Sequence, residues 1–183
     1  MNLVAALEDL LSEPSRCGKS HLIAIDGRAG AGKTTLANEL SLALGVDHAV
    51  TLIHLDMVYA GWEGSLGESL TATLSQLLSD LSGGRATLLP IFNWKEMVFD
   101  SEQVVSPSGL IILEGVGSAQ AAVRKYSTAT IWLDIDPIIG LQRVLDREGM
   151  AFQNQMHRWQ VAEEAHFLAD DTREKADFIL STW

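Results

Sequence analysis

The segment at residues 27–34 constrains the fold of this chain more than any other feature. It reads Gly-Arg-Ala-Gly-Ala-Gly-Lys-Thr and fits the pattern G-x-x-x-x-G-K-[ST]. An apolar run rich in β-forming residues precedes it at 21–26, and an Ala- and Leu-rich stretch of helical period follows it to about residue 44. A strand, a glycine-rich loop and a helix in this order predict a phosphate-binding loop (P-loop) in an α/β protein.

Each residue type in this loop suits the binding of a nucleoside triphosphate. Glycines let backbone N–H groups close around phosphate oxygens, and the next helix directs the positive end of its dipole at the same charge. We expect Lys33 to reach the β- and γ-phosphates, Thr34 to place its hydroxyl on Mg²⁺ and Thr35 to meet the α-phosphate. The predicted ATP-binding residues are Gly27, Arg28, Ala29, Gly30, Ala31, Gly32, Lys33, Thr34 and Thr35.

The rest of the chain alternates apolar runs with segments of helical period. Further strands are expected at 51–55, 110–113, 130–133 and 176–180, and helices at 2–12, 68–81, 118–125, 137–147 and 155–168. Residues 86–92 and 97–105 predict two short strands or a hairpin. Strands separated by helical crossovers favour a three-layer α/β fold with a parallel sheet of about five strands. We expect one domain over residues 1–183.

The charge and the cysteine content exclude several classes of function. With 24 acidic and 13 basic residues the formal charge is −11, so nucleic acid and anionic membranes are not expected partners. Cys17 is the only cysteine, which rules out an internal disulfide and a cysteine-built zinc site, and the five histidines show no metal-ligand spacing. The apolar start contains Glu8 and Asp9 and lacks the basic flank of a signal peptide. These features predict a cytoplasmic protein, and they indicate nothing about its oligomeric state.

Two short motifs suggest other P-loop classes but lack the required context. Residues 81–85 read Leu-Ser-Gly-Gly-Arg, as in the signature loop of ABC transporter ATPases, yet the later strand lacks that family's acidic pair followed by proline. Residues 146–149 fit the D-x-x-G pattern of GTPases, but they lie in helical sequence and no N-K-x-D motif is present. The first is better explained as the end of a helix, and the GTPase class is disfavoured.

Three further features resemble the uridine kinase and phosphoribulokinase group of P-loop proteins, the nucleoside/nucleotide kinase-like NTPases. Asp56-Met57-Val58-Tyr59 is similar to the D-x-F-Y element of uridine kinases, with Val58 in place of Phe. Residues 110–115 form an apolar strand that ends in Glu-Gly, as in those kinases. The arginines between 143 and 158 resemble those of the group's lid, which places a small helical lid at about 143–160.

This resemblance implies roles for individual side chains. Asp56, at the carboxyl end of a strand, would be the general base that accepts the proton of the acceptor hydroxyl. Glu114 would hold Mg²⁺ together with Thr34. Lys33, Arg143 and Arg147 would stabilise the charge on the transferred phosphoryl group. Two other readings stay open: a turn-initiating role for Asp56 and ordinary surface ion pairs for the arginines.

The acceptor is the least determined part of the prediction. The expected acceptor-binding residues are Asp56, Tyr59, Trp62, Phe92, Trp94 and Arg158. Phe92-Asn93-Trp94 stands where related proteins have an aromatic-Asp-aromatic stretch, so Asn93 is a departure that puts a nucleoside acceptor in doubt. A face formed by Trp159, Glu163 and Phe167 on one helix predicts packing of the lid rather than chemistry.

The overall prediction is an ATP- and Mg²⁺-dependent kinase that moves the γ-phosphoryl group to a nucleoside, a nucleotide or a similar small molecule. A different class stays open: a regulatory P-loop protein whose slow ATP hydrolysis switches its conformation for a protein partner. A nucleotide-binding module that has lost catalysis is a third class. The presence of Lys33, Thr34, Asp56 and Glu114 argues against this third class.

Overall fold

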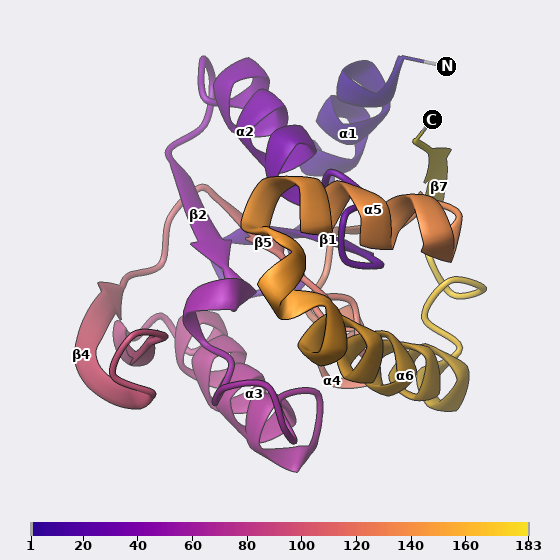
Figure 1. The fold of residues 1–183 in the computed structure, drawn as a ribbon. Coiled ribbons are helices and arrows are strands. Elements are labelled where there is room, and N and C mark those ends of the chain that lie inside the picture. Colours follow the sequence, from indigo (N-terminus) through magenta and orange to yellow (C-terminus); the bar gives the residue numbers. More distant parts are fainter. Residues whose placement is uncertain (1, 183) are drawn as a thin grey trace.

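A five-stranded parallel sheet forms the centre of the computed structural model, which describes residues 2–182 (Figure 1). The strand order is β2-β5-β1-β6-β7, and every neighbouring pair is parallel. The strands are β1 (His21–Gly27), β2 (Val50–His54), β5 (Leu110–Glu114), β6 (Ala129–Asp134) and β7 (Phe178–Ser181). The predicted parallel sheet is confirmed.

Helices cover both faces of this sheet and complete the three layers (Figure 1). Helices α1 and α2 pack on one face, and α3, α4 and α6 pack on the other. The bounds are α1 (Leu3–Leu11), α2 (Lys33–Leu44), α3 (Glu68–Ser82), α4 (Ala121–Arg124), α5 (Pro137–Glu148) and α6 (Gln153–Asp170), with 3-10 turns η1 (Leu55–Met57) and η2 (Met150–Phe152). Among the residues that the structure describes, no helix is long and apolar enough to cross a membrane.

The central strands β1, β5 and β6 are mostly apolar because both of their faces are buried. In β1, Leu22 and Ala24 belong to the core beneath α3 and α6, whereas Ile23 and Ile25 belong to the core beneath α1 and α2. Successive side chains of a strand point to opposite faces, so a strand covered on both sides needs apolar residues at every position. This arrangement explains why the strands appear in the sequence as continuous apolar runs.

A β-hairpin lies beside the central sheet rather than in it. It consists of β3 (Thr87–Asn93) and β4 (Val98–Val105), which pair antiparallel with an irregularity at Ile91 and Phe92. Of the two open expectations for this region, the hairpin is therefore the observed one. Its turn carries Trp94 close to the end of β2, where the Trp94 indole N–H donates to the backbone carbonyl of Asp56 at 2.7 Å.

Helix α4 is shorter than the expected helix at 118–125. The residues before it form a loop that is tied to the end of β1. The Ser118 hydroxyl donates to the carbonyl of Ile25 at 2.7 Å, and the Gly117 N–H donates to the Asp26 carboxylate at 3.0 Å. These bonds hold the loop against β1, and Gly117 has φ +84°, outside the helical region, so the helix begins only at Ala121.

Candidate active site

The carboxyl ends of β1, β2 and β5 meet at one edge of the sheet and open into a cleft of about 740 Å³. The P-loop forms its floor, and helices α5 and α6 contribute residues from the side of the lid. In open parallel sheets, ligands bind at this edge. The cleft brings together most of the predicted site residues: Ala29, Gly30, Gly32, Lys33, Thr34, Thr35, Asp56, Tyr59, Trp62, Trp94, Glu114, Arg143 and Arg147.

Lys33, the first residue of α2, closes the P-loop on itself. Its Nζ donates to the carbonyl oxygens of Gly27 and Arg28, each at 2.8 Å. Gly30 has φ +81°, and a Cβ there would collide with the carbonyl oxygen of Gly140 in α5. Glycine is thus required at Gly30 both by the backbone angle and by the close approach of the lid helix.

Three of the predicted ATP-binding residues form the loop without lining the cleft: Gly27, Arg28 and Ala31. Ala31 is fully buried in the core beneath α1 and α2. The Arg28 side chain turns away toward α6, where it donates to Glu164. The Arg28 side chain therefore attaches the loop to α6, and contact of the Arg28 backbone with the nucleotide stays a prediction.

Asp26, the last side chain of β1 before the loop, is fully buried. Its carboxylate accepts hydrogen bonds from the backbone N–H groups of Gly27 at 2.7 Å, Gly117 at 3.0 Å and Ala119 at 2.8 Å. Burial raises the pKa of Asp26, and these N–H groups and Lys33 counteract the rise in part. Asp26 thus joins the P-loop to the loop after β5. Sequence reasoning missed this role, although a carboxyl residue directly before the glycine loop was a visible signal.

Thr34, Glu114 and His54 meet in one hydrogen-bonded group. The Thr34 hydroxyl donates to Glu114 Oε1 at 3.0 Å, and His54 Nδ1 lies 2.6 Å from the same oxygen. Because a carboxylate only accepts, the imidazole nitrogen is the donor. His54 and Glu114 are register partners in the neighbouring strands β2 and β5. The sequence did not single out His54 for this contact, since strand order is not visible in the sequence.

The donor set at this position fits a hard cation. The Glu114 side chain is buried, and its Oε1 lies within hydrogen-bond distance of the hydroxyl of Thr34, the last residue of the P-loop, and of His54. Mg²⁺ is usually held by one or two oxygen side chains together with the phosphates of a nucleotide. The predicted pairing of Thr34 and Glu114 as metal ligands is compatible with this geometry.

Asp56 lies in η1, directly after β2, and lines the cleft. Its side chain is open to the cleft, but the surrounding protein removes much of its water. This desolvation, together with the negative charge of Glu114, raises the pKa of the Asp56 carboxyl above its ordinary value. A carboxylate with a raised pKa is a better proton acceptor than an ordinary aspartate.

Aromatic rings form the wall of the cleft opposite the P-loop. They are Tyr59, Trp62, Trp94, Phe152 and Trp159. The ring centroid of Trp62 lies 5.2 Å from that of Trp94 and 6.2 Å from that of Trp159. Sequence reasoning included the first three of these residues, treated Trp159 only as lid packing, and did not single out Phe152.

Phe92 does not line the cleft, although the sequence predicted it as an acceptor-binding residue. Its ring packs between those of Trp94, at 5.3 Å, and Phe99, at 5.1 Å. Phe92 therefore supports Trp94 from behind. The physical reason is the alternation of side chains along β3, which turns Phe92 into the hairpin's own packing.

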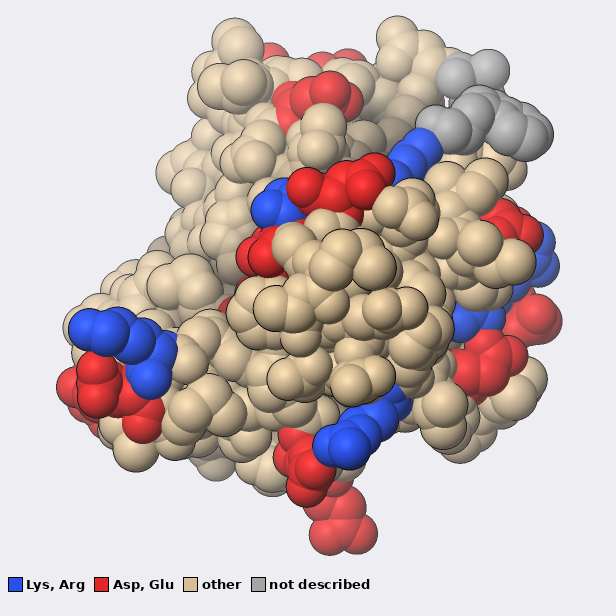
Figure 2. All heavy atoms as spheres, in the orientation of Figure 1, with Lys and Arg blue, Asp and Glu red and all other residues tan. Residues whose placement is uncertain are grey.

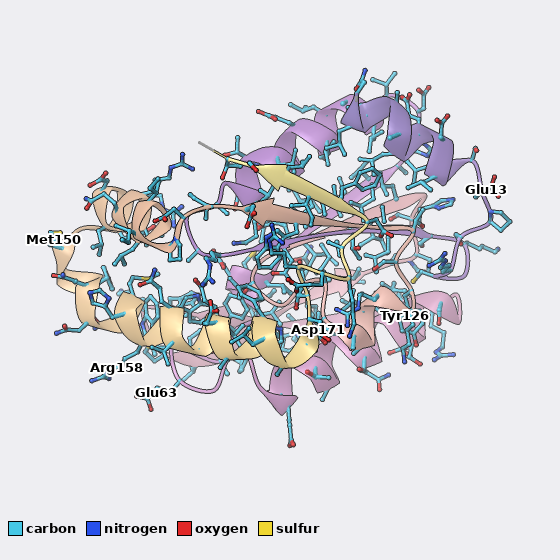
Figure 3. The ribbon with its side chains drawn as sticks, turned by 90° about the vertical axis from the view of Figure 1, so that its right-hand side faces the viewer. Glu13, Glu63, Tyr126, Met150, Arg158 and Asp171 are labelled. Atoms are coloured by element: carbon cyan, nitrogen blue, oxygen red, sulfur yellow. The ribbon has the colours of Figure 1, made fainter. Side chains whose placement is uncertain are left out.

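Two of the three lid arginines reach the cleft. Arg143 and Arg147 both line it from α5, where Arg143 Nη1 lies 3.5 Å from the carbonyl of Gly30 and Arg147 Nε donates to Glu148 at 2.7 Å. Arg158 lies on the outer side of α6, 78% exposed and 3.8 Å from Glu63 (Figure 3). The structure thus does not bring Arg158 to the predicted acceptor pocket, because it stands on the solvent face of its helix.

Comparisons with known proteins place this geometry in a structural context. No protein family model matches the chain, and a search of curated proteins finds no match. Solved structures do match it. One is a possible uridine kinase from Bacillus stearothermophilus, with 23% identity, a TM-score of 0.68, and coverage of 97% of this chain and 96% of that chain.

A second solved structure is similar over nearly its whole length. It is provisionally assigned as a fructose transport system kinase from Silicibacter sp. TM1040, with 18% identity, a TM-score of 0.74, and coverage of 98% of this chain and 99% of that chain. The chain has the fold of the uridine kinase-like P-loop kinases. At these identities the likeness establishes the fold, and the chemistry must be argued from the cleft itself.

Proposed function

We propose that this P-loop protein is an ATP-dependent kinase that transfers the γ-phosphoryl group to a hydroxyl of a small molecule. The observation that carries the proposal is the arrangement of one cleft, in which Asp56 shares the space with Lys33, Thr34 and Glu114. A protein that only bound or hydrolysed ATP would not need an aromatic pocket for a second molecule beside this carboxylate. Both structural neighbours carry kinase assignments, which agrees with the proposal.

Each group of cleft residues has its own role in the proposed phosphoryl transfer. Lys33 and the N–H groups of the P-loop bind the phosphates, and Arg143 and Arg147 face the same space from α5. Thr34 and Glu114 would hold Mg²⁺, which supplies neutralising charge to the phosphates when bound. Asp56 takes the proton from the acceptor hydroxyl as that oxygen forms its bond to the γ-phosphorus and the bond to the ADP oxygen breaks.

The lining of the cleft favours an acceptor with a flat or apolar part. Tyr59, Trp62, Trp94 and Trp159 offer ring faces, and such pockets bind planar groups by stacking and by exclusion of water. This supports a nucleoside-like acceptor over a simple sugar. The Lys and Arg side chains visible in Figure 2 each lie beside acidic ones, which agrees with a small-molecule acceptor rather than a nucleic acid.

The proposal is tested by measuring thermal stabilisation and ADP release with one panel of compounds. We expect Mg·ATP to raise the melting temperature, since a ligand of the folded state stabilises it by mass action. We expect a hydroxyl compound with a planar ring, such as a nucleoside, to accelerate ADP release in the presence of Mg·ATP. Stabilisation by Mg·ATP without turnover on any nucleoside, nucleotide, sugar or vitamin precursor would instead favour the regulatory class. No response to Mg·ATP would contradict both.

A further inference from the structure

Glu163, in the middle of α6, is the least expected contact of the P-loop. Its side chain is only 1% exposed, and its Oε2 accepts a hydrogen bond from the backbone N–H of Ala29 at 3.0 Å. Among residues 2–182, no group hydrogen-bonds to its Oε1, which lies 3.6 Å from Arg28 Nη1. Burying a carboxylate with one oxygen unbonded is unfavourable, so packing alone does not explain an acid at this position.

Neighbouring contacts attach residues 28–30 of the loop to helices α5 and α6. Arg28 donates to Glu164, the residue next to Glu163 on α6, and its guanidinium lies 5.9 Å from the ring centroid of Phe167. Gly30 touches the backbone of Gly140 in α5. Residues 28–30 are therefore all fixed from outside the loop. Ala29 and Gly30 line the cleft together with the later loop residues Gly32, Lys33, Thr34 and Thr35.

Most of the groups that stabilise the Glu163 carboxylate belong to the P-loop. Burial raises the pKa of Glu163, and the N–H of Ala29, the positive charges of Lys33 and Arg28 and, to a smaller extent, the Trp159 side chain counteract the rise. The carboxylate thus depends mainly on the loop for its partners, while the loop depends on it for the position of Ala29. Neither element can shift without loss to the other.

We propose that Glu163 is a positioning residue: it fixes the backbone of the P-loop at Ala29 and thereby couples the position of the lid helix α6 to nucleotide binding. The coupling to nucleotide rests on the function proposed above, whereas the contact itself does not. Glu163 does not touch the cleft, so it acts through the shape of the loop. The role differs from general lid packing because it requires a hydrogen-bond acceptor at this position.

Two variants of Glu163 distinguish the effect of its hydrogen-bond acceptor from the effect of its negative charge. Glu163→Gln keeps an oxygen that accepts from Ala29 but removes the charge, and Glu163→Ala removes both. Glu39→Gln, on the exposed side of α2, is a control with the same change in net charge. The measurements are hydrogen exchange of a peptide that covers residues 27–35 in the ligand-free protein, and the Kd for Mg·ADP by calorimetry.

For Glu163→Ala we expect exchange in this peptide to speed up and the Kd to rise, each about tenfold, the factor that corresponds to loss of one hydrogen bond. The Gln variants at 163 and 39 should stay within about threefold of the wild type. Wild-type exchange and Kd in Glu163→Ala would overturn the proposal. Equal damage in Glu163→Gln and Glu163→Ala would also overturn it, since the acceptor would then not be the feature that matters.

If Glu163→Ala does not fold, a double-mutant cycle measured by thermal unfolding tests the contact between Glu163 and the loop. Arg28→Met leaves the buried carboxylate without its cation, so we expect it to lower the melting temperature of the wild type more than that of Glu163→Gln. Equal losses in the two backgrounds would mean that the Glu163 carboxylate does not face Arg28, and this would overturn its placement against the loop at Ala29. If the wild type binds neither Mg·ADP nor Mg·ATP, the proposed function fails and the coupling to nucleotide fails with it. The exchange and thermal results then still decide the contact between α6 and the loop.

Discussion

The two sides of the cleft are built on different principles. The nucleotide side, made of the P-loop with Asp26 and Glu114, is held by hydrogen bonds among residues at strand ends. The acceptor side, made of Tyr59, Trp62, Trp94, Phe152 and Trp159, is held mainly by ring packing between segments far apart in the chain. The proposed phosphate-binding loop thus faces a wall whose shape depends on which aromatic residues form it. The difference suggests that the phosphate donor is set by the fold, whereas the acceptor is set by the side chains of one wall.

Asp56 lies where the two sides meet, and its replacement should have the largest effect. We expect Asp56→Asn to lower kcat about 10²- to 10⁴-fold, the usual contribution of a general base, with the KM for ATP unchanged. Wild-type activity should rise with pH through the raised pKa of Asp56, and the variant should lose this rise. A pH profile of kcat checks both, and an unchanged kcat in the variant would remove the general-base assignment.

The same substitution should change stability in the opposite direction. A carboxyl whose pKa is raised by folding binds its proton more tightly in the folded state, so its contribution to stability is lost as pH rises from the unfolded pKa through the folded pKa. Above that window the ionised Asp56 is a net cost to the fold. We therefore expect Asp56→Asn to melt at a higher temperature than the wild type at neutral pH, with a smaller gain near pH 4, as checked by thermal unfolding.

Lys33 tests the nucleotide side alone. Lys33→Met removes a charge from the phosphate site and two hydrogen bonds to the loop carbonyls, so kcat/KM should fall about 10²- to 10³-fold. Lys95→Met is the control, because Lys95 is an exposed lysine on the hairpin turn. Steady-state kinetics and calorimetry with Mg·ATP provide the measurement. Wild-type affinity for Mg·ATP in Lys33→Met would contradict the proposed phosphate site.

Trp62 tests the acceptor side alone. Trp62→Ala should raise the KM for the acceptor about 10- to 100-fold, because stacking on one aromatic ring contributes about 1–3 kcal/mol, and should leave the KM for ATP unchanged. Trp94→Phe is the matched variant, since it keeps a ring but removes the hydrogen bond to the carbonyl of Asp56. An equal rise of both KM values in Trp62→Ala would show that the two sides are not separable.

His54 should give the smallest effect. It bonds to the carboxylate of Glu114 without itself lying in the cleft. Changes to such supporting residues typically weaken metal binding about 10-fold to 100-fold, and we expect His54→Asn to lie at the low end of this range in the Mg²⁺ concentration needed for half-maximal activity. His157→Asn, on an exposed position of α6, is the control. An unchanged Mg²⁺ requirement would mean that Thr34 alone positions Glu114.

The sequence by itself determined the features that depend on local patterns. The P-loop of residues 27–34, the five strands and the helices around them follow from glycine placement, apolar runs and helical period, and the structure confirms the parallel sheet. Asp56 and Glu114 could be found in the same way, because each lies at the end of an apolar strand and such ends converge in a parallel sheet.

Only the tertiary structure decided which distant residues meet. It joined His54 to Glu114 by placing β2 beside β5, turned Phe92 behind Trp94 and put Arg158 on the solvent face of α6. It also brought Glu163 to Ala29 across more than a hundred residues of chain. Helical period identifies the buried face of α6, but it does not reveal what covers that face. Such contacts depend on strand order and helix packing, and these arise from the whole fold rather than from any local segment.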